Sequence, residues 1–194
     1  MVLDFALDEL RAADRILSRD LHLKIVGPEK VCILGPNGCG KSTLMDRIAQ
    51  ELVSRKDIRC TYMPQRYGEG VSYSMRPEEF LAPDGDKESV TKARIYLGSM
   101  KYTTDEMSHA VSDLSGGQRA KLLLLKAILD KSNVLLLDEP TRNFSPLSCP
   151  AVRKLLSEFP GCILSVSHDR KFIEEVTSVL YSLTEKGLVR VYRK

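Results

Sequence analysis

The stretch VCILGPNGCGKST, residues 31–43, decides how the rest of the sequence is interpreted. Residues 31–34 form a continuously apolar run, which is typical of a strand buried on both faces of a parallel sheet. A glycine-rich segment follows directly, and residues 44–53 then carry the apolar periodicity of a helix. A buried strand that turns through glycines into a helix predicts an α/β fold.

The same alternation continues along the chain. Residues 134–137 and 162–166 are again short apolar runs that end at polar residues, as central strands of a parallel sheet do. Apolar and polar residues alternate over 3–8 and 21–25, which predicts antiparallel strands near the N-terminus. Gly187 separates two further strand-like segments and indicates a hairpin. Helical periodicity is expected over residues 88–97, 118–129, 152–159 and 171–176.

The length of 194 residues suits one well-cored domain and is too short for two of ordinary size. We expect a single domain over residues 1–194, with a mostly parallel central sheet, flanking helices and an antiparallel β subdomain at the N-terminus. Its core should comprise residues 1–65 and 113–194. The interval 66–112 is polar, is punctuated by prolines and has no convincing buried strand, so we predict a small inserted helical lobe there.

The bulk composition points to no particular partner. The formal net charge is only +3, so charge alone demands neither nucleic acid nor an anionic membrane. The 5 cysteines form no CxxC pair, which favours a reducing compartment over a disulfide framework or a zinc site. No apolar run approaches the roughly 20 residues that a membrane span needs. We therefore expect a cytoplasmic chain without direct membrane insertion, although it could still dock on a membrane protein.

A phosphate-binding loop is predicted at residues 35–42, which match the pattern GxxxxGK[ST] between a strand and a helix. Its three glycines let successive N–H groups point inward, next to the positive end of the helix. Lys41 then reaches the outer phosphates of a nucleotide, and Ser42 holds magnesium. A plain glycine-rich turn would need neither side chain. This pattern predicts a P-loop NTPase whose ATP-binding residues are Gly35, Pro36, Asn37, Gly38, Cys39, Gly40, Lys41, Ser42 and Thr43.

Polar residues also stand at the ends of other predicted strands. Asp138 and Glu139 end one apolar run, His168 follows another, and Gln65 follows a third strand-like segment. Because the carboxyl ends of parallel strands line one edge of a sheet, we expect these side chains beside the phosphate loop. Asp138 could then join the magnesium shell while Glu139 orients or deprotonates the attacking water. Without the loop upstream, an Asp-Glu pair would be interpreted as a solvated strand end.

Five motifs in this sequence occur in one characteristic order. They are the Walker A segment at 35–42, Gln65 after a strand, LSGGQ at 114–118, the Walker B strand with its glutamate at 134–139, and SHD at 167–169. In this order the chain resembles the nucleotide-binding domain of the ATP-binding cassette (ABC) superfamily over nearly its whole length. The resemblance implies that Lys41 and the loop amides bind the phosphates of ATP, that Ser42 and Asp138 share magnesium, and that Gln65 bridges the metal and the attacking water. It further implies three catalytic residues: Glu139 as the base, His168 as the switch histidine, and Gln65.

The LSGGQ motif carries an implication about partners. In that family these residues contact the nucleotide of a second cassette, supplied by the same gene product or by a homodimer. A physical reason supports this role, because a serine can cap the helix, a glutamine three residues later completes a capping box, and the bare glycine amides offer an anion site. The residues expected to act in trans are Ser115, Gly116, Gly117 and Gln118.

The strings EPTRNFS and SVSHDRKFIEEV resemble those of ABC-F proteins, which are double-cassette ATPases that act at the ribosome. The short interval between Gln65 and Leu114 and the lack of a fused membrane segment agree with that branch. With one P-loop and no linker, the chain is expected to be the C-terminal cassette of such a protein or an excised half. Two positions depart from the family pattern: Ser145 stands where the D-loop normally has aspartate, and no aromatic residue lies near Leu10 and Arg11.

Three functions remain open at this stage. The first is an ABC-F ATPase that works at the ribosome, on translation or in antibiotic resistance. The second is the ATPase subunit of a membrane transporter that docks on a permease. The third is a nucleotide-gated dimerisation module without hydrolysis. Glu139 and His168 favour hydrolysis, whereas Ser145 keeps the third interpretation open.

Overall fold

The computed structural model describes residues 2–65, 73–142 and 144–192 and separates into two compact units. We call them the sheet unit and the helical unit. The sheet unit comprises Met1–Gln65, Ser132–Pro140 and Ser157–Lys194, and the helical unit comprises Arg66–Lys131 and Thr141–Leu156. Each unit is described by itself.

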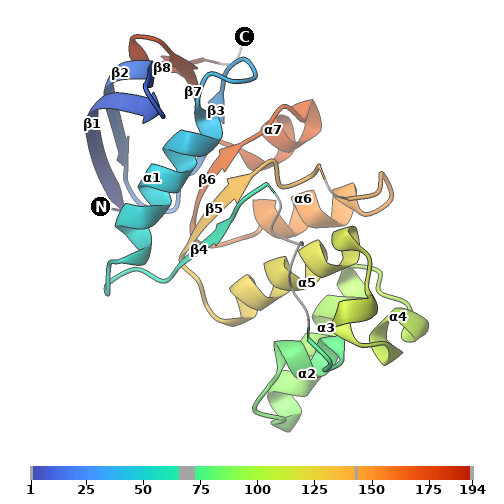
Figure 1. Ribbon diagram of the computed structural model, residues 1–194. Coiled ribbons are helices and arrows are strands. Elements are labelled where there is room, and N and C mark those ends of the chain that lie inside the picture. Colours follow the sequence, from blue (N-terminus) through green and yellow to red (C-terminus); the bar gives the residue numbers. More distant parts are fainter. Residues whose placement is uncertain (1, 66–72, 143, 193–194) are drawn as a thin grey trace. The chain divides into compact units, whose positions relative to one another are not determined.

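The main sheet of the sheet unit has six strands in the order β4-β5-β6-β3-β7-β8 (Figure 1). Neighbouring strands are parallel except for β7 and β8, which are antiparallel. Every residue of β5 and β6 is buried, as their continuous apolar runs predict. The sheet confirms the α/β class. Its strands are β3 (Lys30–Leu34), β4 (Cys60–Met63), β5 (Val134–Asp138), β6 (Cys162–Val166), β7 (Val179–Thr184) and β8 (Gly187–Val191).

A separate two-stranded sheet confirms the antiparallel pair at the N-terminus. Its strands, β1 (Leu3–Ala12) and β2 (Arg15–Ile25), extend beyond the segments in which apolar and polar residues alternate. Pairing continues to Ala12 and Arg15 because the backbone hydrogen bonds of a ladder do not depend on alternating side chains. Alternation therefore located these strands but understated their length.

The tight turn between β7 and β8 lies against β2. Ser18 Oγ donates a hydrogen bond to Thr184 O at 2.7 Å, and the N–H of Arg19 donates to Glu185 O at 3.1 Å. Gly187 has a φ of 106°, and a Cβ added there would lie 2.7 Å from Asp20 O. Glycine is thus required in the predicted hairpin turn both for its left-handed backbone and for this close approach.

Helix α1 (Lys41–Val53) packs against β1, β4 and β5. It begins at Lys41, ahead of the apolar pattern, because Gly40 ends the preceding loop with a φ of 102°. Leu44, Ile48 and Leu52 form its buried face. Burying each of these side chains contributes on the order of 1.5–3 kcal/mol, so the helix that follows the glycine-rich loop is firmly anchored. Near the C-terminal end of the sheet unit, α7 (Arg170–Val176) is capped by Asp169, whose side chain accepts from two backbone N–H groups of the first turn.

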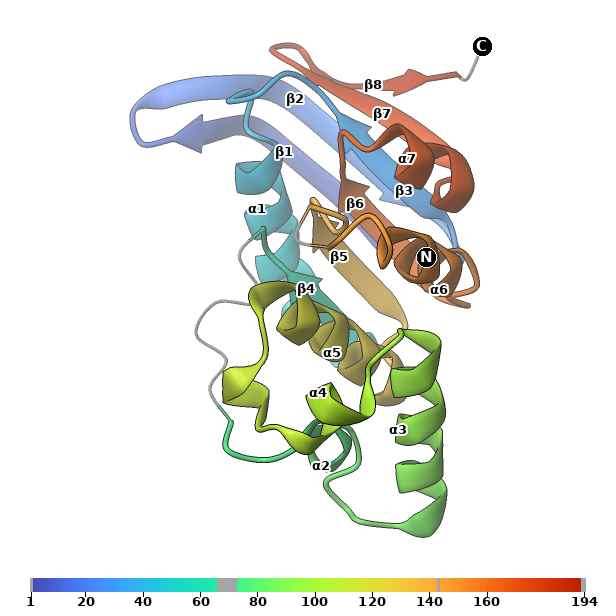
Figure 2. The same ribbon diagram turned by 90° about the vertical axis from the view of Figure 1, so that its right-hand side faces the viewer.

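The helical unit is larger than the lobe expected over 66–112, since it also takes in residues 113–131 and 141–156. Among the described residues of 73–112 we find helices and no strand, while 66–72 lie outside the described residues. Figure 2 shows α2, α3 and α5 gathered together, and these helices contact one another. The helices are α2 (Pro77–Leu81), α3 (Lys87–Ser99), α4 (Thr104–Ser108), the 3₁₀ turn η1 (Val111–Asp113), α5 (Gly116–Leu129) and most of α6 (Cys149–Ser157).

None of the helices in the described part of the chain combines the length and the hydrophobicity that crossing a bilayer requires.

Candidate functional site

The glycine-rich loop between β3 and α1 has the backbone of an anion cradle. Gly35, Gly38 and Gly40 have φ angles of 152°, 78° and 102°, a region that other residues rarely adopt. A Cβ added to Gly40 would lie 2.8 Å from Leu17 Cδ1, so the loop is also packed tightly against the β1–β2 pair. The first helical bond of α1 runs from Leu44 N to Gly40 O at 2.8 Å. The amides of the preceding residues have no acceptor within the helix and are suited to binding phosphate.

Lys41 places its charge inside this loop. Its side chain is only 8% exposed, and Nζ donates to Gly35 O at 2.8 Å and to Pro36 O at 2.9 Å. Ser42 follows at the start of α1 with an exposed side chain. The loop therefore combines a buried ammonium group with an accessible hydroxyl, and this set suits a nucleotide phosphate accompanied by magnesium.

The acidic pair lies at the carboxyl end of β5. Asp138 is the last residue of the strand and is 2% exposed, whereas Glu139 is half-buried. Glu139 has a φ of 52°, and its N–H donates to Val166 O at 2.9 Å. A non-glycine residue in this region costs of order 1–3 kcal/mol, so the neighbouring strand holds a strained turn in place. The turn interrupts the regular alternation of the strand at the position of the two adjacent carboxylates.

Asp138 also influences a neighbouring tyrosine on β4. Burial raises the pKa of the Tyr62 phenol, and the carboxylates of Asp46 and Asp138 raise it further. Tyr62 donates to Asp46 Oδ1 at 2.7 Å, which ties β4 to α1. A carboxyl group at the end of β5 supplies the kind of oxygen ligand that magnesium prefers.

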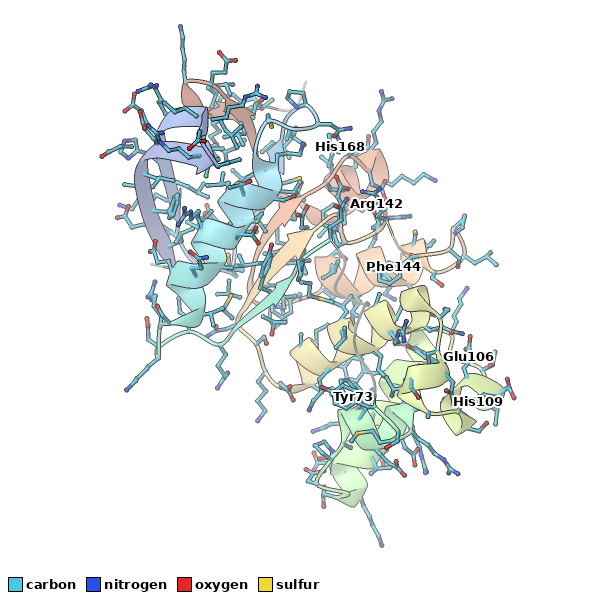
Figure 3. The ribbon with its side chains drawn as sticks, in the orientation of Figure 1. Tyr73, Glu106, His109, Arg142, Phe144 and His168 are labelled. Carbon is cyan, nitrogen blue, oxygen red and sulfur yellow. The ribbon has the colours of Figure 1, made fainter. Side chains whose placement is uncertain are left out.

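His168 comes from the segment between β6 and α7 and is labelled in Figure 3. Its backbone N–H donates to Glu139 Oε2 at 3.4 Å, and its Nε2 lies 3.7 Å from Glu139 Oε1. The structure thus brings together the two residues that the sequence marks as catalytic base and switch histidine. Because the imidazole is exposed, it remains accessible to a ligand bound at this edge.

Gln65 lies just beyond the end of β4. The last residue of that strand, Met63, pairs with Leu137, which precedes Asp138. Gln65 is half-buried and stands two residues beyond Met63, past the carboxyl end of β4 that lies beside the carboxyl end of β5. The phosphate loop and three of the predicted polar strand ends all belong to the sheet unit.

The LSGGQ segment belongs to the helical unit, where it begins α5. Ser115 is the N-cap, and its Oγ accepts from the N–H of Gln118 at 3.3 Å. In return, Gln118 Oε1 accepts from the N–H of Ser115 at 2.6 Å. The capping box predicted from the spacing is therefore present, and Gly116 and Gly117 stand at its open end. The residues of this motif line part of a cavity of about 460 Å³.

The two departures from the expected pattern have structural counterparts. Ser145 is exposed, and its carbonyl accepts from the N–H of Cys149 at the start of α6. Leu10 is fully buried, so it presents no surface to a base. Arg11 is exposed instead, and its guanidinium is held by Glu9, with Nε donating to Oε2 at 2.9 Å. This hydrogen bond, together with the charges of Arg11 and Arg19, keeps the pKa of the Glu9 carboxyl below its usual range.

One contact in the helical unit was missed at the level of sequence. Glu106 of α4, labelled in Figure 3, accepts a hydrogen bond from the side chain of Gln118. The spacing of Thr103 and Glu106 is itself that of a capping box, and this signal could have located the start of α4. The spacing could not have shown that the start of α5 contacts the start of α4.

Comparison with known proteins places this arrangement in a family. The family model described as "ABC transporter" matches residues 18–142. The chain is 33% identical over 180 residues to the probable ATP-binding protein YheS of Escherichia coli, covering 89% of this chain and 28% of that protein. It is 29% identical over 184 residues to ABC transporter F family member 2 of Arabidopsis thaliana, covering 91% and 27%. It is 30% identical over 190 residues to the ATP-binding protein Uup of Haemophilus influenzae, covering 93% and 29%.

A solved structure shares the fold. It is the dimeric, post-hydrolysis state of the ATP-binding cassette MJ0796 bound to ADP and Pi, with a TM-score of 0.73 at 18% identity, covering 95% of this chain and 96% of that one. The chain spans less than half of the length of these curated relatives, 28% in the case of YheS. Since the matched family model takes in well over half of the residues and several relatives are F-type proteins, the chain belongs to the ABC transporter family as an ATP-binding cassette similar to those of ABC-F proteins.

Proposed function

We propose that this chain binds ATP with magnesium and hydrolyses it to ADP and phosphate when it pairs head to tail with a second cassette. The observation that carries hydrolysis is the approach of His168 to Glu139, 3.7 Å between Nε2 and Oε1, at the sheet edge where the phosphate loop begins. The membership of the chain in a family of ATP-binding cassettes supports the choice of ATP.

The residues of the sheet unit divide the chemistry among them. Lys41 and the amides at the start of α1 bind the phosphates, and Ser42, Gln65 and Asp138 hold magnesium. Magnesium neutralises charge on the phosphate oxygens when it is bound. Glu139 accepts a proton from the attacking water as the bond to the leaving ADP breaks. His168 keeps the Glu139 carboxylate oriented and contacts the terminal phosphate.

The second cassette is needed because the LSGGQ segment, in the helical unit, serves a partner's nucleotide in this proposal. Two observations support it. The bare amides of Gly116 and Gly117 follow a capped serine, which is a geometry that binds anions. A cassette with the same fold is described as a dimer bound to ADP and Pi.

Hydrolysis and pairing can be tested together. We expect magnesium-dependent phosphate release whose rate per molecule falls on dilution, and we expect Glu139→Gln to abolish it while trapping an ATP-dependent dimer. A rate per molecule that stays high on dilution would show that one cassette suffices. Magnesium-independent release, or undiminished release by Glu139→Gln, would contradict the assignment of the site.

We also propose that the chain is the C-terminal cassette of an ABC-F-type protein that acts at the ribosome, with antibiotic resistance as one outcome of that action. The F-type relatives and the short share of their length that the chain covers support a double-cassette protein. The cytoplasm is the compartment that this role requires.

The ribosomal role is separated from that of a transporter ATPase by one experiment on the full-length gene product. We expect a Glu139→Gln variant to sediment with ribosomes in ATP and magnesium, and to be released when ATP is replaced by ADP. A Lys41→Ala, Glu139→Gln double variant is the matched control, since it should not bind ATP. Absence from the ribosome pellet together with co-purification of a membrane permease would favour the transporter function instead.

A further inference from the structure

Two helix starts in the helical unit are joined through their side chains. Thr103 and Glu106 form the capping box of α4, and Ser115 and Gln118 form that of α5. In each box the third helical residue reaches back to the N-cap. These two reaching residues also contact each other, because Gln118 Nε2 donates to Glu106 Oε1. The start of α4 is thereby linked to the LSGGQ segment.

Every oxygen of the Glu106 carboxylate has a donor. Oε2 accepts from the N–H of Thr103 at 2.7 Å, and Oε1 accepts from the Gln118 amide. Although burial alone would raise the pKa of Glu106, the hydrogen bonds from Thr103 and Gln118 and the charge of Lys121 lower it below its usual value. Glu106 is therefore an ionised group that can accept hydrogen bonds but cannot donate them.

This property fixes the orientation of the Gln118 amide. A glutamine side chain can turn by 180° and exchange its NH₂ for its oxygen at little intrinsic cost. A carboxylate beside it favours the orientation with the NH₂ toward Glu106, so the Gln118 oxygen must face the N–H of Ser115, where it is found at 2.6 Å. Ser115 Oγ in turn accepts from the Gln118 N–H, which leaves the hydroxyl hydrogen to donate to a ligand.

A second set of contacts holds the backbone of the same turn. The Tyr102 hydroxyl donates to Gln118 O, and Lys121 Nζ lies 4.7 Å from the centre of the Tyr102 ring. Lys121 is 6% exposed and donates to Met100 O at 3.1 Å. The first turn of α5 is thus held by Glu106 through the Gln118 side chain and by Tyr102 through the Gln118 carbonyl.

Glu106, Ser115, Gly117, Gln118 and Lys121 all line the cavity of about 460 Å³ in the helical unit. The network consequently forms part of a surface that a ligand can reach.

From these contacts we propose that Glu106 is a positioning residue for the LSGGQ segment: by fixing Gln118, it holds the Ser115 hydroxyl and the Gly116 and Gly117 amides ready for the triphosphate of a second cassette. The inference rests on the proposed function, because it assumes that this segment acts on a partner's nucleotide. Glu106 does not itself touch the nucleotide in this proposal.

The test uses the full chain carrying Glu139→Gln as the parent, with two variants, Glu106→Gln and Glu106→Ala. Glu106→Gln keeps the size of the side chain but removes its negative charge. It thereby removes the constraint on the Gln118 amide, because an amide can face Gln118 with either end. Glu79→Gln is the matched control. Glu79 occupies the same position in the capping box of α2, where its Oε2 accepts from the N–H of Arg76 at 3.0 Å.

We expect both Glu106 variants to weaken ATP-dependent dimerisation, as measured by sedimentation velocity. The dimerisation constant should fall severalfold for Glu106→Gln and about tenfold or more for Glu106→Ala, because a charge-assisted hydrogen bond is lost. The affinity of the monomer for ATP should stay unchanged, and Glu106→Gln should shift the melting temperature no more than Glu79→Gln does. A purely structural role would move stability and dimerisation together. If the parent does not dimerise in ATP and magnesium, both the proposed function and this inference are wrong. If the parent dimerises and Glu106→Gln dimerises equally well, the inference alone is overturned.

Discussion

His168 approaches Glu139 in two ways: its backbone N–H donates to Oε2 at 3.4 Å, and its Nε2 lies 3.7 Å from Oε1. Each carboxylate oxygen therefore faces a different part of the same residue. The left-handed backbone of Glu139, with a φ of 52°, turns the chain at this point. A carboxylate oriented in this manner suits a group that must accept a proton from one particular water.

Replacing Glu139 with glutamine should separate binding from hydrolysis. Because Lys41 and the loop amides remain intact, we expect the ATP affinity to stay within a factor of about two of that of the unaltered chain. Loss of one hydrogen bond to the phosphates would lower the affinity by more than this. Loss of the base should lower the turnover rate by roughly 10²–10⁴. Phosphate release and equilibrium dialysis measure the two quantities. Glu174→Gln, on the exposed part of α7, is the control and should hydrolyse ATP normally. Rapid ATP turnover by Glu139→Gln would show that Glu139 is not the catalytic base.

Two inactive variants should complement each other if the site is shared between cassettes. Lys41→Ala removes the phosphate lysine, and Ser115→Arg blocks the LSGGQ segment, so each homodimer lacks activity. In an equal mixture, half of the dimers are mixed and each holds one intact combination, so we expect recovery of about a quarter of the normal rate. A mixture as inactive as its components, at concentrations where dimers form, would indicate that both groups act on the nucleotide of their own chain.

Cys39 provides a label inside the phosphate loop. Its sulfur would lie 2.9 Å from a Cβ added at Gly35, so bound triphosphate should shield it. We expect ATP with magnesium to slow its alkylation at pH 8 severalfold, as followed by peptide mass spectrometry, whereas adenosine should not. Alkylation that is indifferent to ATP would argue against phosphates lying on this loop.

Two other cysteines serve as internal controls in that experiment. Burial raises the pKa of the Cys60 thiol to about 11 and that of the Cys162 thiol to about 12. A raised pKa keeps the thiol protonated at pH 8, with about one molecule in a thousand as thiolate for Cys60. Both should stay unlabelled at pH 8 with or without ATP, and labelling of Cys60 should rise only as the pH approaches 11.

Two glycine-to-alanine changes should have opposite signs. Gly187 has a φ of 106°, and a Cβ added there would lie 2.7 Å from Asp20 O. We therefore expect Gly187→Ala to lower the free energy of unfolding by about 1–3 kcal/mol. At Gly98, inside α3, an added Cβ would meet nothing within 4 Å. Helix propensity then predicts a gain of up to about 1 kcal/mol. Urea unfolding monitored by circular dichroism measures both. Equal effects of the two changes would contradict the role assigned to the β7–β8 turn.

Much of the sheet unit could be predicted because its signals are local. The apolar run 134–137 indicated β5, and glycines before a helical pattern indicated the loop before α1. Both depend on which side chains water excludes, and that information is present in consecutive residues. The helix start at Lys41 was missed by a few residues because the backbone of Gly40, and no apolar side chain, decides it.

The relations between segments could not be read in the same way. The left-handed Glu139 is held by a bond to Val166, which lies far along the chain. The contact between Glu106 and Gln118 links two helix starts whose spacings look independent. Leu10 is buried against the loop glycine through packing that alternation does not reveal. Each of these depends on tertiary contacts, which a single sequence without comparisons does not specify.

The position of β3 in the sheet also bears on the order in which the chain can become competent during synthesis. β3 carries the phosphate loop near the beginning of the sequence, yet it lies between β6 and β7, which come close to its end. A nascent chain that has emerged only through α6 would expose β3 without either of its neighbouring strands, β6 and β7. Because such distant pairings form slowly, nucleotide binding is expected only after β6 and β7 have been synthesised and have paired with β3.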